Sequence, residues 1–160
     1  MIRPATTEDL PVLLTLYAAA RRFMAQNGNP TQWGDTYPAR ELLEEDIREG
    51  ELYVVTQDDR IVGVFVFTTQ PEPTYAVIQD GAWRNDAPYG TIHRIASDGT
   101  VKGVFGRCVA FCVGRCPNLR IDTHRDNHTM RHLVQKHGFV YCGVITVADG
   151  SPRMAYQYGA

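Results

Sequence analysis

A short loop with two glycines and a lysine joins an expected strand to an expected helix in the middle of the chain. The strand covers residues 91–97 and the helix 104–115, with Gly99, Lys102 and Gly103 between them. The first N–H groups of a helix lack intrahelical acceptors, and together with the helix dipole they attract anions. Glycine also lets the backbone turn tightly and approach a ligand closely. The segment is typical of a pyrophosphate site, but a plain strand–loop–helix connection accounts for the same glycines equally well.

A second polar segment follows a short strand further along the chain. The strand is expected at residues 119–123, and the helix after it at 127–137, just before Gly138. Asp126 is the expected N-cap, because a carboxylate accepts hydrogen bonds from the first helical N–H groups. The amide of Asn127 is then left with a donor and an acceptor near the mouth between two strands.

Alternating strand and helix patterns position these two segments. Apolar residues spaced from Leu10 to Ala18 at helical intervals predict an amphipathic helix that begins after Thr6 or Thr7. The clearest hairpin joins β-branched and aromatic strands at 52–56 and 61–68. No repeat or long linker interrupts the pattern, so residues 1–160 are expected to form one domain. The other expected elements are a strand at 2–5, a helix at 39–49, a short strand at 76–78, and strands at 140–148 and 153–158.

The composition is that of an ordinary globular protein. Hydrophobic residues make up 44% and charged residues 21% of the 160 residues. Sixteen basic and eighteen acidic residues give a formal charge of −2, which disfavours nucleic-acid binding through phosphate neutralisation. No apolar run approaches the ~20 residues that span a bilayer, so no membrane partner is expected. The N-terminal residues lead straight into a polar stretch, so no signal peptide is expected and a cytoplasmic location is predicted.

The residue types that bind metals do not form a recognisable metal motif. Cys108, Cys112 and Cys116 recur every fourth residue, which fits either a metal site or one buried helix face. The core interpretation is favoured, because zinc ligands usually occur as two separated pairs. His128 and His132 also lie four apart, but no HExxH pattern surrounds them and a solvated helix face explains them better. No metal is expected.

Four stretches of the chain, in the same order, resemble members of the GNAT superfamily of acyl-CoA-dependent N-acetyltransferases. They read IRPATTEDLPVLLTLY, LYVVTQDDRIVGVFVF, IHRIASDGTVKGV and LRIDTHRDNHTMRHLVQKHGFVYCGVI, and they span nearly the whole sequence. The resemblance implies an α/β fold with a mixed, twisted, mostly antiparallel sheet, splayed between its fourth and fifth strands and flanked by helices. It also implies that acetyl-CoA lies in the splay.

The resemblance assigns cofactor contacts to individual residues. The pantetheine would pair by backbone with the fourth strand and contact Asn127, and the pyrophosphate would lie on the following loop. That loop keeps only the central glycine of the family pattern and is about two residues shorter. The family's general-acid tyrosine corresponds to Val134. The strand residues concerned are Ile95, Ala96 and Ser97, and the loop residues are Thr100, Val101, Lys102, Gly103 and Val104.

Candidate residues for the acceptor side lie on the same strand and on aromatic loops. His93 is expected to share a strand face with Ile95 and Ser97, where it could accept the amine proton. A histidine hydrogen-bonded in the core is the alternative. In the family, the first-helix region and the segment before the cofactor strand border the acceptor. The aromatic residues Trp33, Tyr37 and Tyr75 are therefore substrate-pocket candidates, or else lids over the core.

The expected reaction is direct transfer of the acetyl group from acetyl-CoA to a primary amine. A backbone N–H, that of Ile95, would stabilise the oxyanion, and no covalent enzyme intermediate is needed. The acceptor is a small molecule or a peptide whose identity the sequence does not give, and a homodimer is one expectation for the assembly. The alternative is an acyl-CoA-binding regulatory module without turnover. A dinucleotide-binding domain is disfavoured, because the chain does not begin with a βαβ unit.

Overall fold

The computed structural model describes residues 1–159. Within that range, seven strands form one mixed sheet in the order β1-β2-β3-β4-β5-β7-β6. The elements are β1 (Ile2–Pro4), η1 (Thr7–Asp9), α1 (Leu10–Gln26), α2 (Arg40–Arg48), β2 (Leu52–Gln57), β3 (Arg60–Thr68), η2 (Pro73–Tyr75), β4 (Gly90–Ser97), α3 (Val104–Val113), β5 (Leu119–Thr123), α4 (His128–Lys136), β6 (Val140–Thr146) and β7 (Pro152–Tyr158), where η denotes a short 3₁₀ helix.

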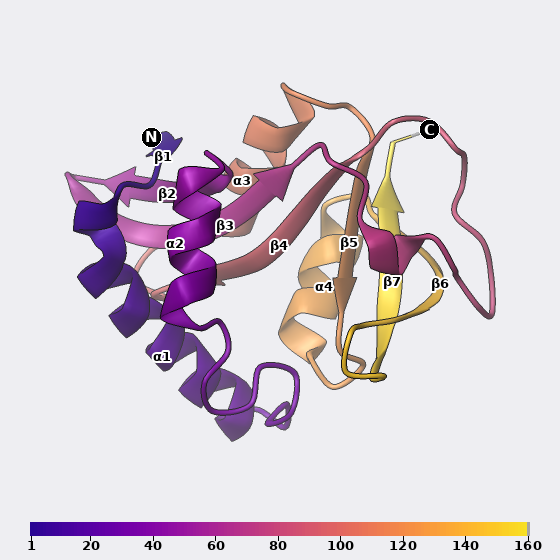
Figure 1. Ribbon diagram of the computed structural model, residues 1–160, viewed down its shortest axis with the longest axis horizontal. Helices are drawn as coiled ribbons and strands as arrows, with labels where there is room; N and C mark the ends of the chain where they lie inside the picture. The colour runs from indigo at the N-terminus through magenta and orange to yellow at the C-terminus, as the bar shows by residue number, and fades with distance from the viewer. Residues whose placement is uncertain (160) are drawn as a thin grey trace.

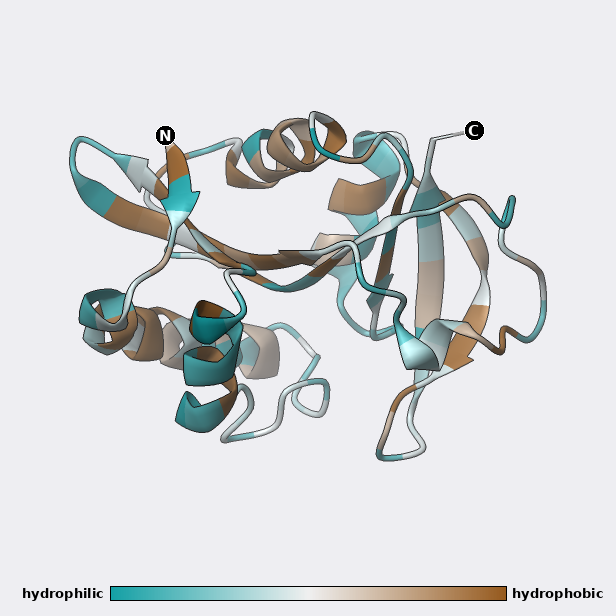
Figure 2. Cartoon of the chain, turned by 45° about the horizontal axis from the view of Figure 1, so that its top comes forward, coloured by the Kyte–Doolittle hydropathy of each residue, from teal (hydrophilic) through white to brown (hydrophobic). Residues whose placement is uncertain are grey.

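Helices cover both faces of the sheet. Helices α1 and α2 lie on one face, and α3 and α4 lie on the other (Figures 1 and 2). The core is correspondingly divided. One cluster packs α1 and α2 residues such as Leu13 and Leu43 against the sheet. A second cluster packs Phe105, Cys108 and Val134 from α3 and α4 against the opposite side. Brown hydrophobic segments run along the central strands between the helix layers (Figure 2).

The sheet opens between its fourth and fifth strands. Strands β4 and β5 are parallel and pair only at Gly90 with Leu119 and at Thr91 with Arg120. All the other strand pairs are antiparallel across the described residues. Beyond Thr91 the two strands separate, which leaves the β5-facing backbone edge of β4 free to pair with a ligand. The expected α/β fold, with its splay between strands four and five, is confirmed.

A β-bulge interrupts β4 just beyond the start of the splay. The pairing with β3 shifts there by one residue, so that Arg94 and Ile95 together lie opposite Phe65. Arg94 has a φ of 48°, in the left-handed region that non-glycine residues seldom occupy. A bulge adds one residue to one strand and changes which face each later side chain occupies.

Because of the bulge, His93 lies on the opposite face of the sheet from Ile95. The strand partner of His93 is Val66, which belongs to the α1 and α2 cluster, so His93 faces that side of the sheet. Ile95 packs against the α3 and α4 cluster on the other side. The prediction that His93 shares a face with Ile95 and Ser97 is therefore wrong, because simple alternation fails across an inserted residue.

Two further expectations differ from the structure. The short strand expected at 76–78 is absent; the residues before it, Pro73–Tyr75, form η2, and Gln79 after it makes one isolated bridge to Val144. The N-cap of α4 is Asn127 instead of Asp126, because the Asn127 side chain accepts a hydrogen bond from the N–H of Met130. The cysteine expectation agrees with the structure for Cys108 and Cys112, which are buried in the core, and burial raises the pKa of Cys108 to about 12. Cys116 lies beyond the end of α3 and is only partly buried.

Candidate active site

A cavity of about 810 Å³ lies at the splay. Its wall comes from the loop after α1, from β4 and β5 where they diverge, from the start of α4, and from the loops at residues 70–74 and 147–149. Trp33, Tyr37, His93, Ile95 and Asn127 are the sequence-predicted site residues that line it. The cavity thus brings together three of the four acceptor-side candidates and one end of the predicted cofactor strand; Tyr75 is the exception.

His93 is held in the cavity wall as a neutral imidazole. Its ring centroid lies 6.5 Å from that of Tyr75. Burial, and to a lesser extent the positive charge of Arg94, lower the pKa of His93 to about 4. At neutral pH the side chain is therefore unprotonated and can accept a proton.

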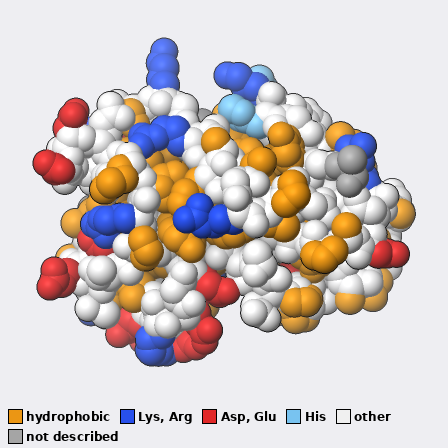
Figure 3. Space-filling model, turned by 90° about the horizontal axis from the view of Figure 1, so that it is seen from above, with side chains coloured by type: hydrophobic (Ala, Val, Ile, Leu, Met, Phe, Trp, Pro, Cys, Tyr) orange, Lys and Arg blue, Asp and Glu red, His pale blue; other side chains and the backbone are white. Residues whose placement is uncertain are grey.

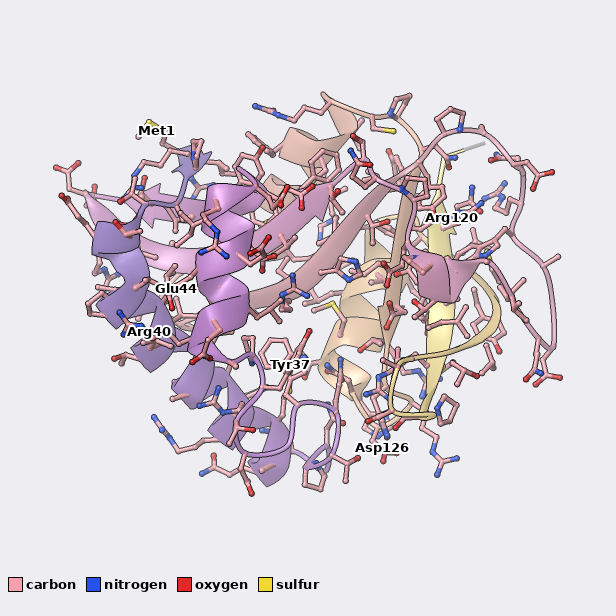
Figure 4. All side chains as sticks on the ribbon, in the orientation of Figure 1. Met1, Tyr37, Arg40, Glu44, Arg120 and Asp126 are labelled. Carbon is pink, nitrogen blue, oxygen red and sulfur yellow. The ribbon has the colours of Figure 1, made fainter. Side chains whose placement is uncertain are left out.

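The bulge residue Arg94 is fixed by three contacts. Its guanidinium donates to Asp46 Oδ2 at 2.8 Å and to the Tyr37 hydroxyl at 3.1 Å. The Tyr17 hydroxyl donates to the Arg94 carbonyl at 2.6 Å. Because the carbonyl and N–H of a trans peptide point in opposite directions, this bond aims the N–H of Ile95 away from α1. Figure 4 shows Tyr37 on the loop that leads into α2.

The three aromatic candidates occupy different positions. Trp33 and Tyr37 line the cavity, with ring centroids 6.3 Å apart. Tyr75 is only 2% exposed and does not line the cavity. Its hydroxyl instead donates to Asp122 Oδ2 at 2.6 Å, and it is Asp122 that reaches the cavity.

Asp122 is a site residue that the sequence reasoning missed. It lies on β5, between the buried residues Ile121 and Thr123, and burial raises its pKa. One signal was available. A carboxylate inside a short strand of otherwise buried residues is unusual, because an ionised side chain is costly to bury without partners.

Asn127 is already engaged on both sides of its amide. Its Oδ1 caps α4 through the Met130 N–H at 3.1 Å, and its Nδ2 donates to Gln32 Oε1 at 3.1 Å. The free donor and acceptor expected from the sequence are therefore both used within the chain. Gln32 connects the loop after α1 to the start of α4 and was also missed.

The predicted anion loop lies outside the cavity, at the far end of β4. Gly103 is the N-cap of α3 with a φ of 80°, and a Cβ added there would meet no atom within 4 Å. The N–H of Thr100 is already bonded to Asp98 Oδ1 at 2.9 Å. Lys102 is exposed, whereas Val104 is buried. The loop joins Ser97, at the end of β4, to Val104, the first residue of α3.

The remaining predicted cofactor residues lie along β4, between the cavity and the loop. Ala96 is buried in the α1 and α2 cluster, and Ser97 pairs with Gly63 of β3 and is exposed. Val101 packs partly against the α3 and α4 cluster. On the molecular face shown in Figure 3, hydrophobic side chains gather near the centre and are bordered by Lys and Arg side chains.

Among residues 1–159, no group of three or more His, Cys, Asp or Glu side chains is arranged to hold a metal ion. None of the described helices is both long and apolar enough to cross a membrane.

Solved structures with the same architecture identify the family. An acetyltransferase of the GNAT family from Streptococcus agalactiae 2603 is 32% identical, with a TM-score of 0.84 over 100% of this chain and 95% of that chain. A structure from Staphylococcus aureus Mu50 is 26% identical, with a TM-score of 0.70 over 99% and 98% of the two chains. A ribosomal-protein-alanine N-acetyltransferase from Brucella melitensis shares the fold at 18% identity, with a TM-score of 0.65 over 100% and 99% of the two chains.

No protein-family model and no curated protein sequence matches the chain. The structural relative from Streptococcus agalactiae nevertheless exceeds 30% identity over the full length of this chain. The chain belongs to the GNAT family of acetyltransferases.

Proposed function

We propose that the protein is an N-acetyltransferase that moves the acetyl group of acetyl-CoA to a primary amine of a small molecule or peptide. The observation that carries this proposal is the free edge of β4, which runs from the cavity toward the N-terminus of α3. Pantetheine would pair with Ile95, Ala96 and Ser97 along that edge. Its pyrophosphate would lie on the backbone of residues 101–104, where helix N–H groups favour anions, because the N–H of Thr100 is already bonded to Asp98.

The proposed mechanism is direct attack by the amine on the acetyl carbonyl. The N–H of Ile95, aimed by the Tyr17–Arg94 hydrogen bond, stabilises the oxyanion. His93, unprotonated at neutral pH, accepts a proton from the attacking nitrogen. Trp33 and Tyr37 bound the space for the acceptor's apolar part.

A CoA-binding module without turnover is the second candidate, and one observation favours it. Val134, which corresponds to the tyrosine that acts as general acid in the family, is fully buried in the core. A valine side chain carries no proton donor, so position 134 cannot protonate the departing thiolate. The two candidates predict the same CoA binding and differ in whether thiol is released.

Acetyl-CoA is expected to stabilise the folded protein. A ligand that binds only the native state at ~100 times its dissociation constant adds about 2.7 kcal/mol to the free energy of unfolding. For a domain of this size that corresponds to a rise of roughly 5–10 °C in the melting temperature, measured by differential scanning calorimetry. S-acetylpantetheine, which lacks the pyrophosphate and nucleotide, is the matched control and should give a much smaller rise. An unchanged melting temperature in millimolar acetyl-CoA would contradict the proposal.

A further inference from the structure

Asp122 and His93 lie on opposite sides of the opening of the sheet. Each lies two residues beyond the last β4–β5 pair, that of Thr91 with Arg120, so they stand at the same level on adjacent diverging strands. Ile121, the neighbour of Asp122, packs in the α3 and α4 cluster. Asp122 therefore faces the opposite side, which is also the side that His93 faces. Both side chains line the cavity.

Tyr75 connects this pair from behind the cavity wall. Its hydroxyl donates to Asp122 Oδ2 at 2.6 Å, and its ring lies 6.5 Å from the His93 ring between centroids. A bond to one carboxylate oxygen fixes the direction in which the other oxygen can accept a proton or bind a cation. The arrangement places two proton-accepting groups in the wall of the same cavity.

The chemistry of amine acetylation requires two proton transfers from the same nitrogen. An alkylammonium ion carries three N–H bonds, and the amide product carries one. One N–H bond must break before attack, to expose the lone pair, and the second breaks as the C–N bond forms and the C–S bond is lost. One of the two protons ends on the CoA thiolate and the other in solvent. A single base such as His93 serves only one of these transfers at a time.

We propose that Asp122 is a second catalytic residue, which binds the acceptor's ammonium group and takes its first proton, and that Tyr75 is its positioning residue. This inference rests on the proposed function and names the acceptor as an amine that enters as a cation. An N–H bond breaks as an O–H bond forms on Asp122, and the neutral amine then attacks while His93 takes the second proton. Proton transfer from the ammonium group to Asp122 removes both charges, which the burial of Asp122 favours.

The charges around Asp122 agree with this assignment. Burial raises the Asp122 pKa, Glu72 raises it further, and the Tyr75 hydrogen bond and Arg153 lower it. Arg94, the other cationic side chain of the wall, is already paired with Asp46. Cavity-lining carboxyl groups outnumber the remaining cation, which favours a positively charged ligand. The carboxyl groups are Glu51, Glu72, Asp122 and Asp149, and the remaining cation is Arg153.

Binding of benzylammonium to the CoA-saturated protein tests the first half of the proposal without requiring turnover. Calorimetry should show that benzylammonium binds and that its uncharged analogue, benzyl alcohol, binds much more weakly. Asp122→Asn should weaken benzylammonium binding about 10- to 100-fold, the range of a charged hydrogen bond, and leave CoA affinity unchanged. Asp149→Asn, which removes an exposed carboxyl from the same wall, is the matched control and should change binding less than threefold. Equal binding to wild type and Asp122→Asn, or no preference for the cation, would overturn the inference.

The pH dependence of thiol release tests the roles of Asp122 and Tyr75 in proton transfer. The Tyr75 hydroxyl lowers the Asp122 pKa, so Tyr75→Phe should raise it. The acidic limb of the pH profile of thiol release, where it depends on Asp122, should then move to higher pH. A merely structural tyrosine would lower stability and leave the limb in place, and that result would contradict the positioning role. Failure of the proposed function has a different signature: the wild type would release no thiol with any amine, although benzylammonium binding still depended on Asp122.

Discussion

Replacing His93 with alanine is expected to lower the turnover of acetyl-CoA with an amine by about 10²-fold while leaving acetyl-CoA affinity nearly unchanged. General-base catalysis contributes roughly 10²–10⁴-fold, and a base of low pKa falls at the lower end of that range. The pKa of His93 is about 4, because the imidazole is buried beside Arg94. Steady-state kinetics with separate kcat and KM values for the two substrates measures the effect.

The pH profile separates a catalytic His93 from a structural one. A base works only when unprotonated, so wild-type kcat/KM should fall as the pH drops through about 4, and His93→Ala should lack that component. The folded-state pKa lies below the unfolded value, so this histidine also destabilises the fold progressively from about pH 6.5 down to about pH 4. His132→Ala, an exposed histidine on α4, is the control. Wild-type turnover and an unchanged profile in folded His93→Ala would make His93 structural.

The second large effect is expected at the N-terminus of α3. Gly103→Asp should weaken CoA binding by about 10²-fold, because it adds a negative charge where the pyrophosphate is proposed to lie. Two charges about 4 Å apart repel by about 4 kcal/mol at an effective dielectric constant of 20, and salt screening reduces this. A Cβ at Gly103 meets no atom within 4 Å, so the variant should fold, at a modest cost for the φ of 80°.

Gly103→Asn is the matched control for the charge. Asparagine tolerates the left-handed conformation about as well as aspartate and has nearly the same size, so it should weaken CoA binding much less. Gly99→Asp places the same charge elsewhere on the loop, also at a position with no neighbouring atom within 4 Å. Isothermal titration of CoA into the three variants gives the comparison. Equal CoA affinity in wild type and Gly103→Asp would place the pyrophosphate elsewhere.

The fold could be predicted from the sequence because its signals are local and periodic. The helical spacing after Thr7 and the hairpin around Asp58 and Asp59 each specify one element, and these elements form where expected. The prediction of a short strand at 76–78 is wrong. Only one isolated bridge, from Gln79 to Val144, forms beside this segment, and a single bridge does not make a strand. The splay itself came from the resemblance to the family and not from residue patterns.

The candidate site was harder to predict because its geometry depends on long-range contacts. The bulge that turns His93 to the α1 and α2 face is stabilised by Tyr17 and Asp46, far away in the sequence. Asp122 and Tyr75 meet across 47 residues, and neither belongs to a motif. The resemblance pointed to Asn127. Its capping bond from the Met130 N–H is local to α4, whereas its bond to Gln32 depends on the position of the loop after α1.

The proposed N-acetyltransferase activity is tested most directly by measuring acetyl transfer itself. The protein is incubated with [¹³C-acetyl]-CoA and a panel of primary amines, while free thiol is followed by absorbance and products by mass spectrometry. We predict thiol release that depends on the amine, with an equal amount of ¹³C-acetylated amine formed. Tight CoA binding with neither thiol release nor acetylated product for any amine would contradict it, and would leave a CoA-binding module as the function of this fold.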